Sequence, residues 1–171
     1  MNPYENCPCF DTEHFHLRLV TMDDAEDLMV CYGDRKAWPI FNADHCTSDF
    51  RYTELSEMRE CIRFWLECYA VNDFVRWSVI DHAIGKAIGT IEMFDAPGGN
   101  SVMRLDLASA YETEALTGEL LDLALARFYE FFTMSGIATK VVFEAAGRKA
   151  AALARGFVHE GTADFYVCCR A

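Results

Sequence analysis

The order in which hydrophobic periodicities follow one another restricts the fold of this chain more than any other feature. Between residues 75 and 108, apolar and polar side chains alternate in three short runs separated by turn-forming residues, a pattern that predicts three antiparallel strands. From Leu116 to Phe132 the apolar side chains instead recur at every third or fourth position, which predicts one long amphipathic helix. Strands and helices in this order favour a mixed α/β domain.

The three predicted strands of this meander are Val75–Asp81, Ala87–Asp95 and Val102–Ala108. We expect the glycine-containing segment His82–Lys86 to form the first turn, and Ala96–Asn100, with the sequence APGGN, to form the second. Because successive side chains of a strand point to opposite faces, one face of the meander is expected to be core and the other polar.

Further strands and helices flank the meander. No repeat or low-complexity linker interrupts the chain, so we expect one domain over residues 1–171, with residues 1–13 as an N-terminal extension. The remaining predicted elements are a strand at His14–Val20, a helix from Thr21 to about Gly33, a helix at Thr53–Ala70, a strand at Ile137–Glu144 after Gly136 has ended the long helix, a short helix at Arg148–Arg155 and a last strand at Ala163–Cys169.

The charge balance argues against some classes of partner. The chain has 15 Lys and Arg residues against 27 Asp and Glu residues, a net charge of −12, whereas nucleic-acid binding rests on a basic surface. A hydrophobic content of 52% provides for a core, yet no apolar run is long enough to cross a bilayer. Residues 1–10 lack the basic start and apolar block of a signal peptide. We therefore expect a cytoplasmic protein with no nucleic-acid or membrane partner.

Eight cysteines would suggest a disulfide framework in a short secreted chain, but a reducing compartment keeps most cysteines as thiols. An alternative is that Cys7 and Cys9 converge with Cys168 and Cys169, near the other end of the chain, to bind zinc. Their spacing differs from the C-x-x-C of zinc ribbons and fingers. We therefore expect no metal site.

The element order and three local sequences resemble one family of enzymes. The local sequences are Leu17-Arg18-Leu19 before an acidic helix start, Ile84–Ile91 in the second meander strand, and Ala154-Arg155-Gly156-Phe157 near the end. Together they are similar to the GNAT superfamily of acyl-CoA-dependent N-acyltransferases, and within it to the branch that acetylates ribosomal-protein N-termini and polyamines. The resemblance covers residues 14–169 and implies an α/β fold: a mixed, mostly antiparallel sheet with one splayed parallel pair and helices on both faces.

The resemblance also implies a binding site for acetyl-CoA. In the family, the third meander strand and the following strand run parallel and splay apart, and the pantetheine arm pairs with exposed backbone, here at Asp106, Leu107 and Ala108. A motif of the form Gln/Arg-x-x-Gly-x-Gly/Ala then wraps the pyrophosphate at the start of the long helix, where backbone N–H groups hold phosphate. The matching residues in this chain are Glu112, Thr113, Glu114, Ala115, Leu116, Thr117 and Gly118.

This segment departs from the family pattern. Glu112 stands in place of an amide or basic residue, and Ala115 and Thr117 stand in place of the first and second glycines. Glu114 adds a second carboxylate beside the expected pyrophosphate, where like charges repel. The alternative is that Tyr111–Gly118 begins an ordinary helix, with both carboxylates favourably placed at its positive end. A working cofactor site and an ordinary helix start both stay open.

In the family, the acceptor amine attacks the thioester directly, so the site needs a group that takes up a proton. Counting back from the second turn, Glu92 faces Arg104 and Thr90 faces Asp106 on one sheet face. Glu92 and Asp106 are therefore the candidate catalytic bases. The alternative, which we favour for Glu92, is a cross-strand ion pair with Arg104. The family's tyrosine acid has no counterpart at residues 151–154.

Two functions from different classes fit these features. The first is an N-acetyltransferase that moves an acetyl group from acetyl-CoA to a primary amine, either a small cationic amine or a peptide N-terminus. The acidic balance of the chain favours a cation by electrostatic steering. The second is a GNAT-shaped protein that has lost catalysis and serves as a binding or interaction module. A homodimer is compatible with both.

Overall fold

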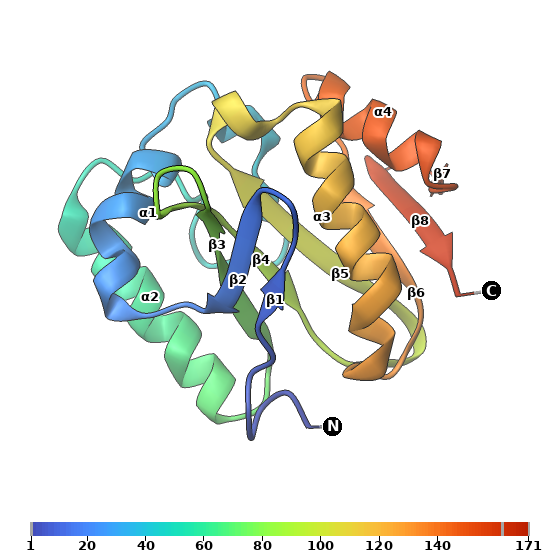
Figure 1. Cartoon of the computed structure of the whole chain (residues 1–171), viewed down its shortest axis with the longest axis horizontal. Coiled ribbons are helices and arrows are strands. Elements are labelled where there is room, and N and C mark those ends of the chain that lie inside the picture. The colour runs from blue at the N-terminus through green and yellow to red at the C-terminus, as the bar shows by residue number, and fades with distance from the viewer. Residues whose placement is uncertain (1, 162, 171) are drawn as a thin grey trace.

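A mixed sheet carries the fold (Figure 1). The computed structural model describes residues 2–161 and 163–170, and within them eight strands are hydrogen-bonded in the order β1-β2-β3-β4-β5-β6-β8-β7. Neighbouring strands are antiparallel except β5 and β6, which are parallel. The strands are β1 (Phe10–Asp11), β2 (Phe15–Leu19), β3 (Val75–Asp81), β4 (Lys86–Met93), β5 (Ala96–Leu107), β6 (Met134–Lys140), β7 (Val158–His159) and β8 (Phe165–Cys169).

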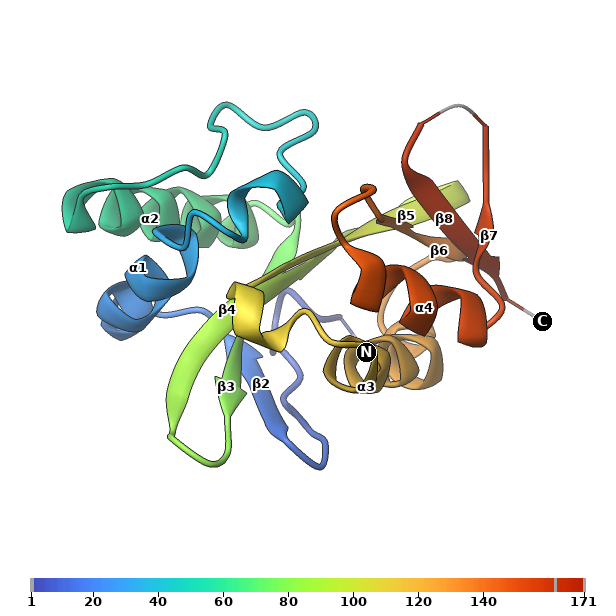
Figure 2. The same ribbon diagram turned by 90° about the horizontal axis from the view of Figure 1, so that it is seen from above.

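Helices cover both faces of the sheet (Figure 2). On one side lie α1 (Ala25–Tyr32), which follows a short 3₁₀ turn, and α2 (Leu55–Ala70); on the other side lie α3 (Glu114–Arg127) and α4 (Ala146–Ala154). The predicted α/β class, with its parallel pair and its helices on two faces, is thus confirmed.

Each side of the sheet has its own apolar core. On the α3 side, Trp77 of β3 stacks on Phe128, with ring centroids 5.2 Å apart. On the α1 side, Tyr32 packs against Phe50 and Trp65, with centroids 5.7 and 5.8 Å apart. Because α1 and α2 cover the sheet face that carries Glu92, the polar face of the meander is buried.

Strand β5 changes partner partway along its length. Residues 100–103 pair with residues 136–139 of β6, whereas residues 104–107 pair with residues 89–92 of β4. This register confirms the predicted pairing of Glu92 with Arg104 and of Thr90 with Asp106. The last β5–β6 pair in the described residues is Met103 with Thr139, and we call the point beyond it, where the two strands diverge, the fork.

The prediction of a turn at Ala96–Asn100 was wrong. These residues begin β5 and lie beside β6, with Ala96 paired to Met134. Asp95 fixes this crossing, because its carboxylate accepts a hydrogen bond from the Thr133 N–H at 2.6 Å while the Ala96 N–H donates to the Thr133 carbonyl at 2.9 Å. The APGGN sequence instead forms an irregularity within β5.

The prediction that Gly136 ends the long helix was also wrong. Helix α3 ends at Arg127, and a 3₁₀ turn over residues 128–130 follows. Gly136 lies inside β6, which starts earlier than the sequence pattern predicts. A Cβ at this position would lie 2.7 Å from Oδ1 of Asn100 and 2.8 Å from the carbonyl oxygen of Cys168. The glycine therefore permits a close approach of neighbouring chain segments.

The N-terminal extension contributes to the sheet and to its core. Strand β1 pairs with β2, and the Phe10 ring lies 6.0 Å from that of Trp77 and 5.7 Å from that of Phe128. The sequence pattern did not predict β1, because two residues are too few to show an alternation.

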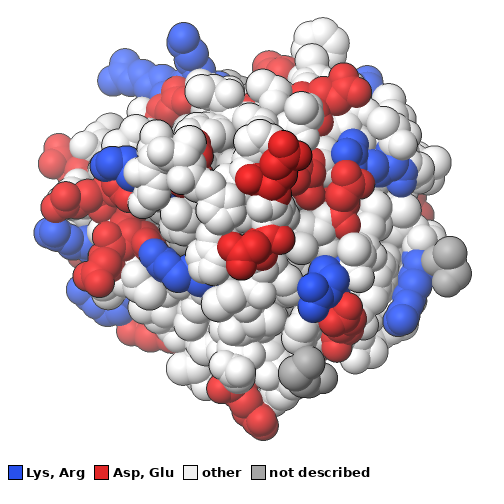
Figure 3. Space-filling view, viewed as in Figure 1, with Lys and Arg blue, Asp and Glu red and all other residues white. Residues whose placement is uncertain are grey.

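Charged side chains of both signs lie on the face of the molecule seen in Figure 3. On the face seen in Figure 3, basic side chains lie scattered among acidic ones. A nucleic-acid backbone binds to a clustered basic patch, and this face shows none. Among the described residues, no helix combines the length and the apolar character needed to cross a membrane.

Gly89 of β4 provides a test of the sheet. A Cβ there would overlap the carbonyl oxygen of Asp106 and lie 2.8 Å from the Cα of Leu107, both backbone atoms of β5. We expect Gly89→Val to lower the free energy of unfolding by about 3 kcal/mol through overpacking, measured by urea denaturation. Gly99→Ala is the control, because a Cβ there meets the Ala96 carbonyl oxygen at 3.9 Å. Equal stability of Gly89→Val and wild type would contradict this close approach.

Candidate active site

A cavity of about 660 Å³ opens on the α2 side of the sheet. It lies between α2, the segment that joins α1 to α2, and strands β3, β4 and β5. A volume of this size is typical of small-molecule sites in proteins. We therefore take it as the candidate acceptor site and describe its floor, its walls and its mouth in turn.

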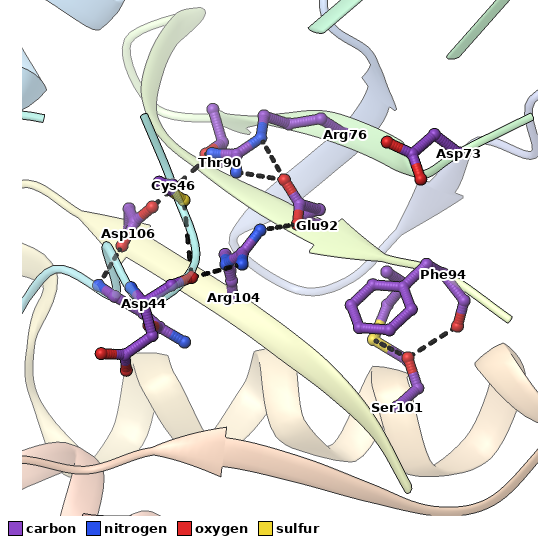
Figure 4. A network of polar contacts seen from close by, with 12 residues as sticks. Asp44, Cys46, Asp73, Arg76, Thr90, Glu92, Phe94, Ser101, Arg104 and Asp106 are labelled. Atoms are coloured by element: carbon purple, nitrogen blue, oxygen red, sulfur yellow. Dashed lines mark hydrogen bonds and ion pairs between the residues drawn. The ribbon is translucent and has the colours of Figure 1, made fainter. Parts of the chain in front are cut away.

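Three charged side chains form the floor of the cavity (Figure 4). Glu92 of β4 lies between Arg76 of β3 and Arg104 of β5. One carboxylate oxygen of Glu92 accepts hydrogen bonds from Nε of Arg76, at 3.1 Å, and from its Nη2. The other oxygen accepts from Nη1 of Arg104. The favoured alternative for Glu92, an ion pair with Arg104, is therefore present, and both oxygens are engaged by guanidinium groups.

Arg76 is a buried cation with partners on several sides. Its Nη1 donates to the Thr90 hydroxyl at 3.0 Å and to the Tyr32 hydroxyl at 3.2 Å, and its Cζ lies 4.1 Å from the centroid of the Trp65 ring. Burial by itself lowers the pKa of Arg76, but the negative charges of Glu92 and Asp106, the Tyr32 hydroxyl and the hydrogen bond to Glu92 together outweigh this effect, and the pKa is raised. The guanidinium thus stays charged where little water reaches it.

Asp106 lies behind the floor and does not belong to the described residues that line the cavity. Its carboxylate accepts hydrogen bonds from the Asn42 N–H at 3.0 Å and from the Tyr32 hydroxyl at 3.4 Å, and it lies 3.6 Å from Nη1 of Arg76. Burial raises the pKa of Asp106, although the charge of Arg76 opposes the shift. A raised pKa suits a proton acceptor near neutral pH, but the hydrogen bonds of this carboxylate point to the protein interior.

Aromatic side chains wall the cavity, and carboxylates stand at its mouth. The exposed acids are Glu57 and Glu60 of α2 and Asp73 before β3. Hydrogen bonds from the backbone N–H groups of Thr53 and Glu54 hold the pKa of Glu57 below its ordinary value, so Glu57 stays charged. Such a cavity suits a cation attached to an apolar body. The walls are formed by Phe50, Tyr52, Phe64, Trp65, Phe74 and Phe94.

Two thiols also line the cavity. Burial raises the pKa of Cys46, and it raises that of Cys61 to about 11. Since the thiolate is the nucleophilic form, neither thiol is activated for attack. Throughout the described part of the chain, His, Cys, Asp and Glu side chains form no group of three that could hold a metal ion.

The segment between α1 and α2 ties the cavity floor to the fork. Arg104 directly follows the last β5–β6 pair, and its Nη2 donates to the carbonyl oxygen of Asp44 at 2.7 Å. Lys140, at the end of β6, lies 2.8 Å from the Asp44 carboxylate. Asp44 therefore contacts both diverging strands, and the cavity floor reaches the point where they separate.

Beyond the fork, the backbone predicted to hold the cofactor arm is covered. Leu105, Asp106 and Leu107 are fully buried. The Ala108 N–H is already bonded to the Ile88 carbonyl at 2.9 Å. Residues 105–107 are therefore shielded from solvent, and Ala108 continues the pairing of β5 with β4.

Arg148 of α4 extends between the ends of the two strands. Its Nη1 donates to the carbonyl oxygen of Lys140, at the end of β6, at 3.3 Å. Its Nε donates at 3.1 Å, and its Nη2 also donates, to the carboxylate of Glu112, which follows β5. Burial raises the pKa of Glu112, against the opposing charge of Arg148. A Cβ at Gly147 would overlap the Glu112 carbonyl oxygen, so the start of α4 touches this loop.

These contacts bear on the two segments that the resemblance assigns to acetyl-CoA, the start of α3 and the space between β5 and β6. The start of α3 is accessible, because Glu114 and Ala115 are exposed and Thr113 caps the helix by accepting from the Leu116 N–H at 3.3 Å. The space between β5 and β6, in contrast, holds the buried side chain of Arg148. In this arrangement the Arg148 side chain lies where the family resemblance places the cofactor arm.

The sequence pattern named Glu92 and Asp106 but missed their partners. Arg76 is the cross-strand neighbour of Glu92, and the alternation of the predicted strand Val75–Asp81 was a signal that could have found it. Asp44 and Arg148 come from a loop and a helix whose approach to the sheet depends on tertiary packing, and no local signal indicates them.

Solved structures share this fold. An acetyl transferase from Salmonella typhimurium that modifies the N-terminal serine of 50S ribosomal subunit protein L7/L12 has a TM-score of 0.70 at 13% identity, covering 92% of this chain and 96% of that chain. A ribosomal L7/L12 alpha-N-protein acetyltransferase in complex with coenzyme A has a TM-score of 0.69 at 12% identity, covering 95% and 98%. A GNAT-family acetyltransferase from Bacillus anthracis has a TM-score of 0.66 at 11% identity, covering 95% and 99%.

No protein-family model matches the sequence, and no curated protein matches it either. At the identities of the solved structures, the similarity concerns the fold. The chain has the fold of the GNAT acetyltransferases, as the resemblance in its sequence implied.

The floor network provides a second test. Glu92→Gln keeps the shape of the side chain but removes the charge that balances two guanidinium groups. Because an unpaired buried charge is costly, we expect a loss of about 3–5 kcal/mol in the free energy of unfolding, measured by denaturant titration. Glu67→Gln, on the exposed face of α2, is the control and should change stability by less than about 0.5 kcal/mol. A Glu92→Gln variant as stable as wild type would show that the network is not held in the folded state.

Proposed function

We propose that this chain is an N-acetyltransferase whose amine acceptor binds in the cavity beside the fork. The observation that carries the proposal is the position of the cavity, since its floor residue Arg104 lies where β5 and β6 diverge. In the family that the sequence resembles, acetyl-CoA supplies the acetyl group from between these two strands. An acceptor seated on the cavity floor thus has its amine close to the fork.

The lining of the cavity supports a primary amine as the acceptor. The acids at the mouth attract a cation, and the aromatic walls favour a ligand with apolar surface behind the charge. A small cationic amine or a peptide N-terminus with an apolar side chain meets both demands. The similar structures include enzymes named for peptide N-termini, which supports the second of these. All eight cysteines are free thiols, which suits the reducing cytoplasm as its location.

The charged side chains of the cavity floor affect the protonation of a bound amine. Two guanidinium groups disfavour the protonated form of an amine placed beside them, because like charges repel. Glu92 limits this effect and holds Arg104 in place, so we assign it a positioning role. Asp106 is the remaining candidate base from the sequence, and it connects to the floor through the hydroxyl of Tyr32.

A binding module with this fold is the second candidate, and the filled space between β5 and β6 favours it. In that case the cavity still binds an amine, but no acetyl group is transferred. Turnover separates the two candidates, because ligand binding to the cavity is common to both.

The test measures acetyl transfer from acetyl-CoA to a panel of amines. Transfer is monitored through the free thiol of coenzyme A that the reaction releases. The panel holds an arylalkylamine, a polyamine and peptides with apolar or polar N-terminal residues. We expect saturable turnover, and we expect Glu60→Lys to raise the KM of the preferred amine about fivefold at low salt, because it reverses a charge at the cavity mouth. The kcat should change little, since the mouth does not touch the reacting atoms.

Glu67→Lys is the matched control for this experiment. It makes the same charge change on the same helix but at a position outside the cavity, so its KM should equal that of wild type. An equal rise for both variants would mean that net charge alone steers the amine. No turnover with any amine would contradict the transferase and leave the binding module.

A further inference from the structure

A guanidinium group beyond the fork joins the end of β6 to the loop that leads from β5 to α3. Arg148 reaches from the first turn of α4 to Lys140 at the end of β6 and to Glu112, in the loop between β5 and α3. The side chains of Arg148 and Glu112 are 1% and 5% exposed, so water hardly reaches the pair. The pair therefore closes the space between the strands from the α4 side.

The carboxylate of Glu112 is turned inward. An exposed carboxylate at this position would act on a nearby phosphate through solvent, and salt would screen the repulsion. A buried carboxylate instead neutralises Arg148 and is screened little. The acidic residue at Glu112 is thus one half of an ion pair whose other half lies 36 residues later in the sequence.

We propose that the Glu112–Arg148 pair is a lock on the space between β5 and β6, which excludes the arm of coenzyme A while the pair is formed. The inference rests on the proposed function, because it concerns the entry of the acetyl donor. Opening of the pair frees the Arg148 guanidinium near the exposed start of α3 at Glu114 and Ala115. An anionic phosphate is favoured at such a place, by a guanidinium and by free backbone N–H groups alike.

The test removes both halves of the pair at once. Glu112→Gln with Arg148→Ala empties the space and leaves no unpaired charge behind. A single substitution at either residue would leave its partner as an unpaired buried charge. Isothermal titration with acetyl-CoA, and with coenzyme A lacking the acetyl group, measures affinity without any turnover. We expect at least tenfold tighter binding than in wild type, and a correspondingly larger rise of Tm at saturating ligand. The gain should persist at high ionic strength, because a buried pair is screened little.

A second ion pair, on the same side of the sheet, provides the control. Arg155, just after α4, pairs with Asp122 of α3 at 2.6 Å, and the Asp122 side chain is 61% exposed. Asp122→Asn with Arg155→Ala should leave the affinity for acetyl-CoA within twofold of wild type. Each variant is first shown to unfold cooperatively without ligand. If the double variant of the lock does not, Glu112→Gln with Arg148→Met takes its place, because it also leaves no unpaired charge and keeps more of the buried volume, with the same expected direction.

The outcomes separate the lock from the proposed function. If wild type binds acetyl-CoA as tightly as the double variant does, the lock is overturned. Turnover by wild type would in that case still support the transferase. A double variant that binds the cofactor tightly but transfers no acetyl group supports the lock and contradicts the transferase. If neither wild type nor the double variant binds acetyl-CoA, the lock is overturned. A gain in affinity that vanishes at high ionic strength also overturns it, because it would indicate repulsion at the surface instead of a buried pair.

Discussion

The division of strand β5 between two partners is the constraint on which the rest of the structure depends. A strand can pair along both edges, but β5 pairs with β6 over its first part and with β4 over its last part. The sheet therefore opens beyond Met103, and the backbone groups at the opening need other partners. The Lys140 carbonyl at the end of β6 accepts from the Arg148 side chain, and the Arg104 side chain beside the opening donates to the carbonyl of Asp44 in the loop between α1 and α2. Side-chain hydrogen bonds thus fill the region where the backbone pairing of β5 with β6 has ended.

Closing the opening in this way places charge in the interior. The network around Glu92 and the Glu112–Arg148 pair are both almost fully buried. Apolar replacements of buried ion pairs are often neutral or stabilising, so stability alone does not account for two such networks beside one fork. Their positions suggest separate tasks: the first shapes the floor of the cavity, and the second controls the space on the far side of β5.

The register of the meander could be predicted although its turn could not. The pairing of Glu92 with Arg104 depends on where the chain reverses, and the midpoint of 92 and 104 is Gly98, whether the residues around it form a tight turn or the start of a strand. Faces and cross-strand pairs follow from that midpoint and from the two-residue period. The placement of Gly136 depended instead on contacts with Asn100 and Cys168, which are distant in sequence and leave no local pattern.

The acid at the start of the long helix shows why a site is harder to predict than a fold. Compared with a phosphate-binding motif, Glu112 looks like an added repulsion, because the sequence gives its charge but not its partner. What a carboxylate does depends on the nearest opposite charge and on the water around it, and here both are set by the packing of α4 against the loop at Gly147. With Arg148 in place, the same residue ceases to act at the surface and becomes part of the interior. The departure from the motif is therefore a change in what fills the space between β5 and β6, and the GNAT fold persists because side chains now provide the contacts that close that space.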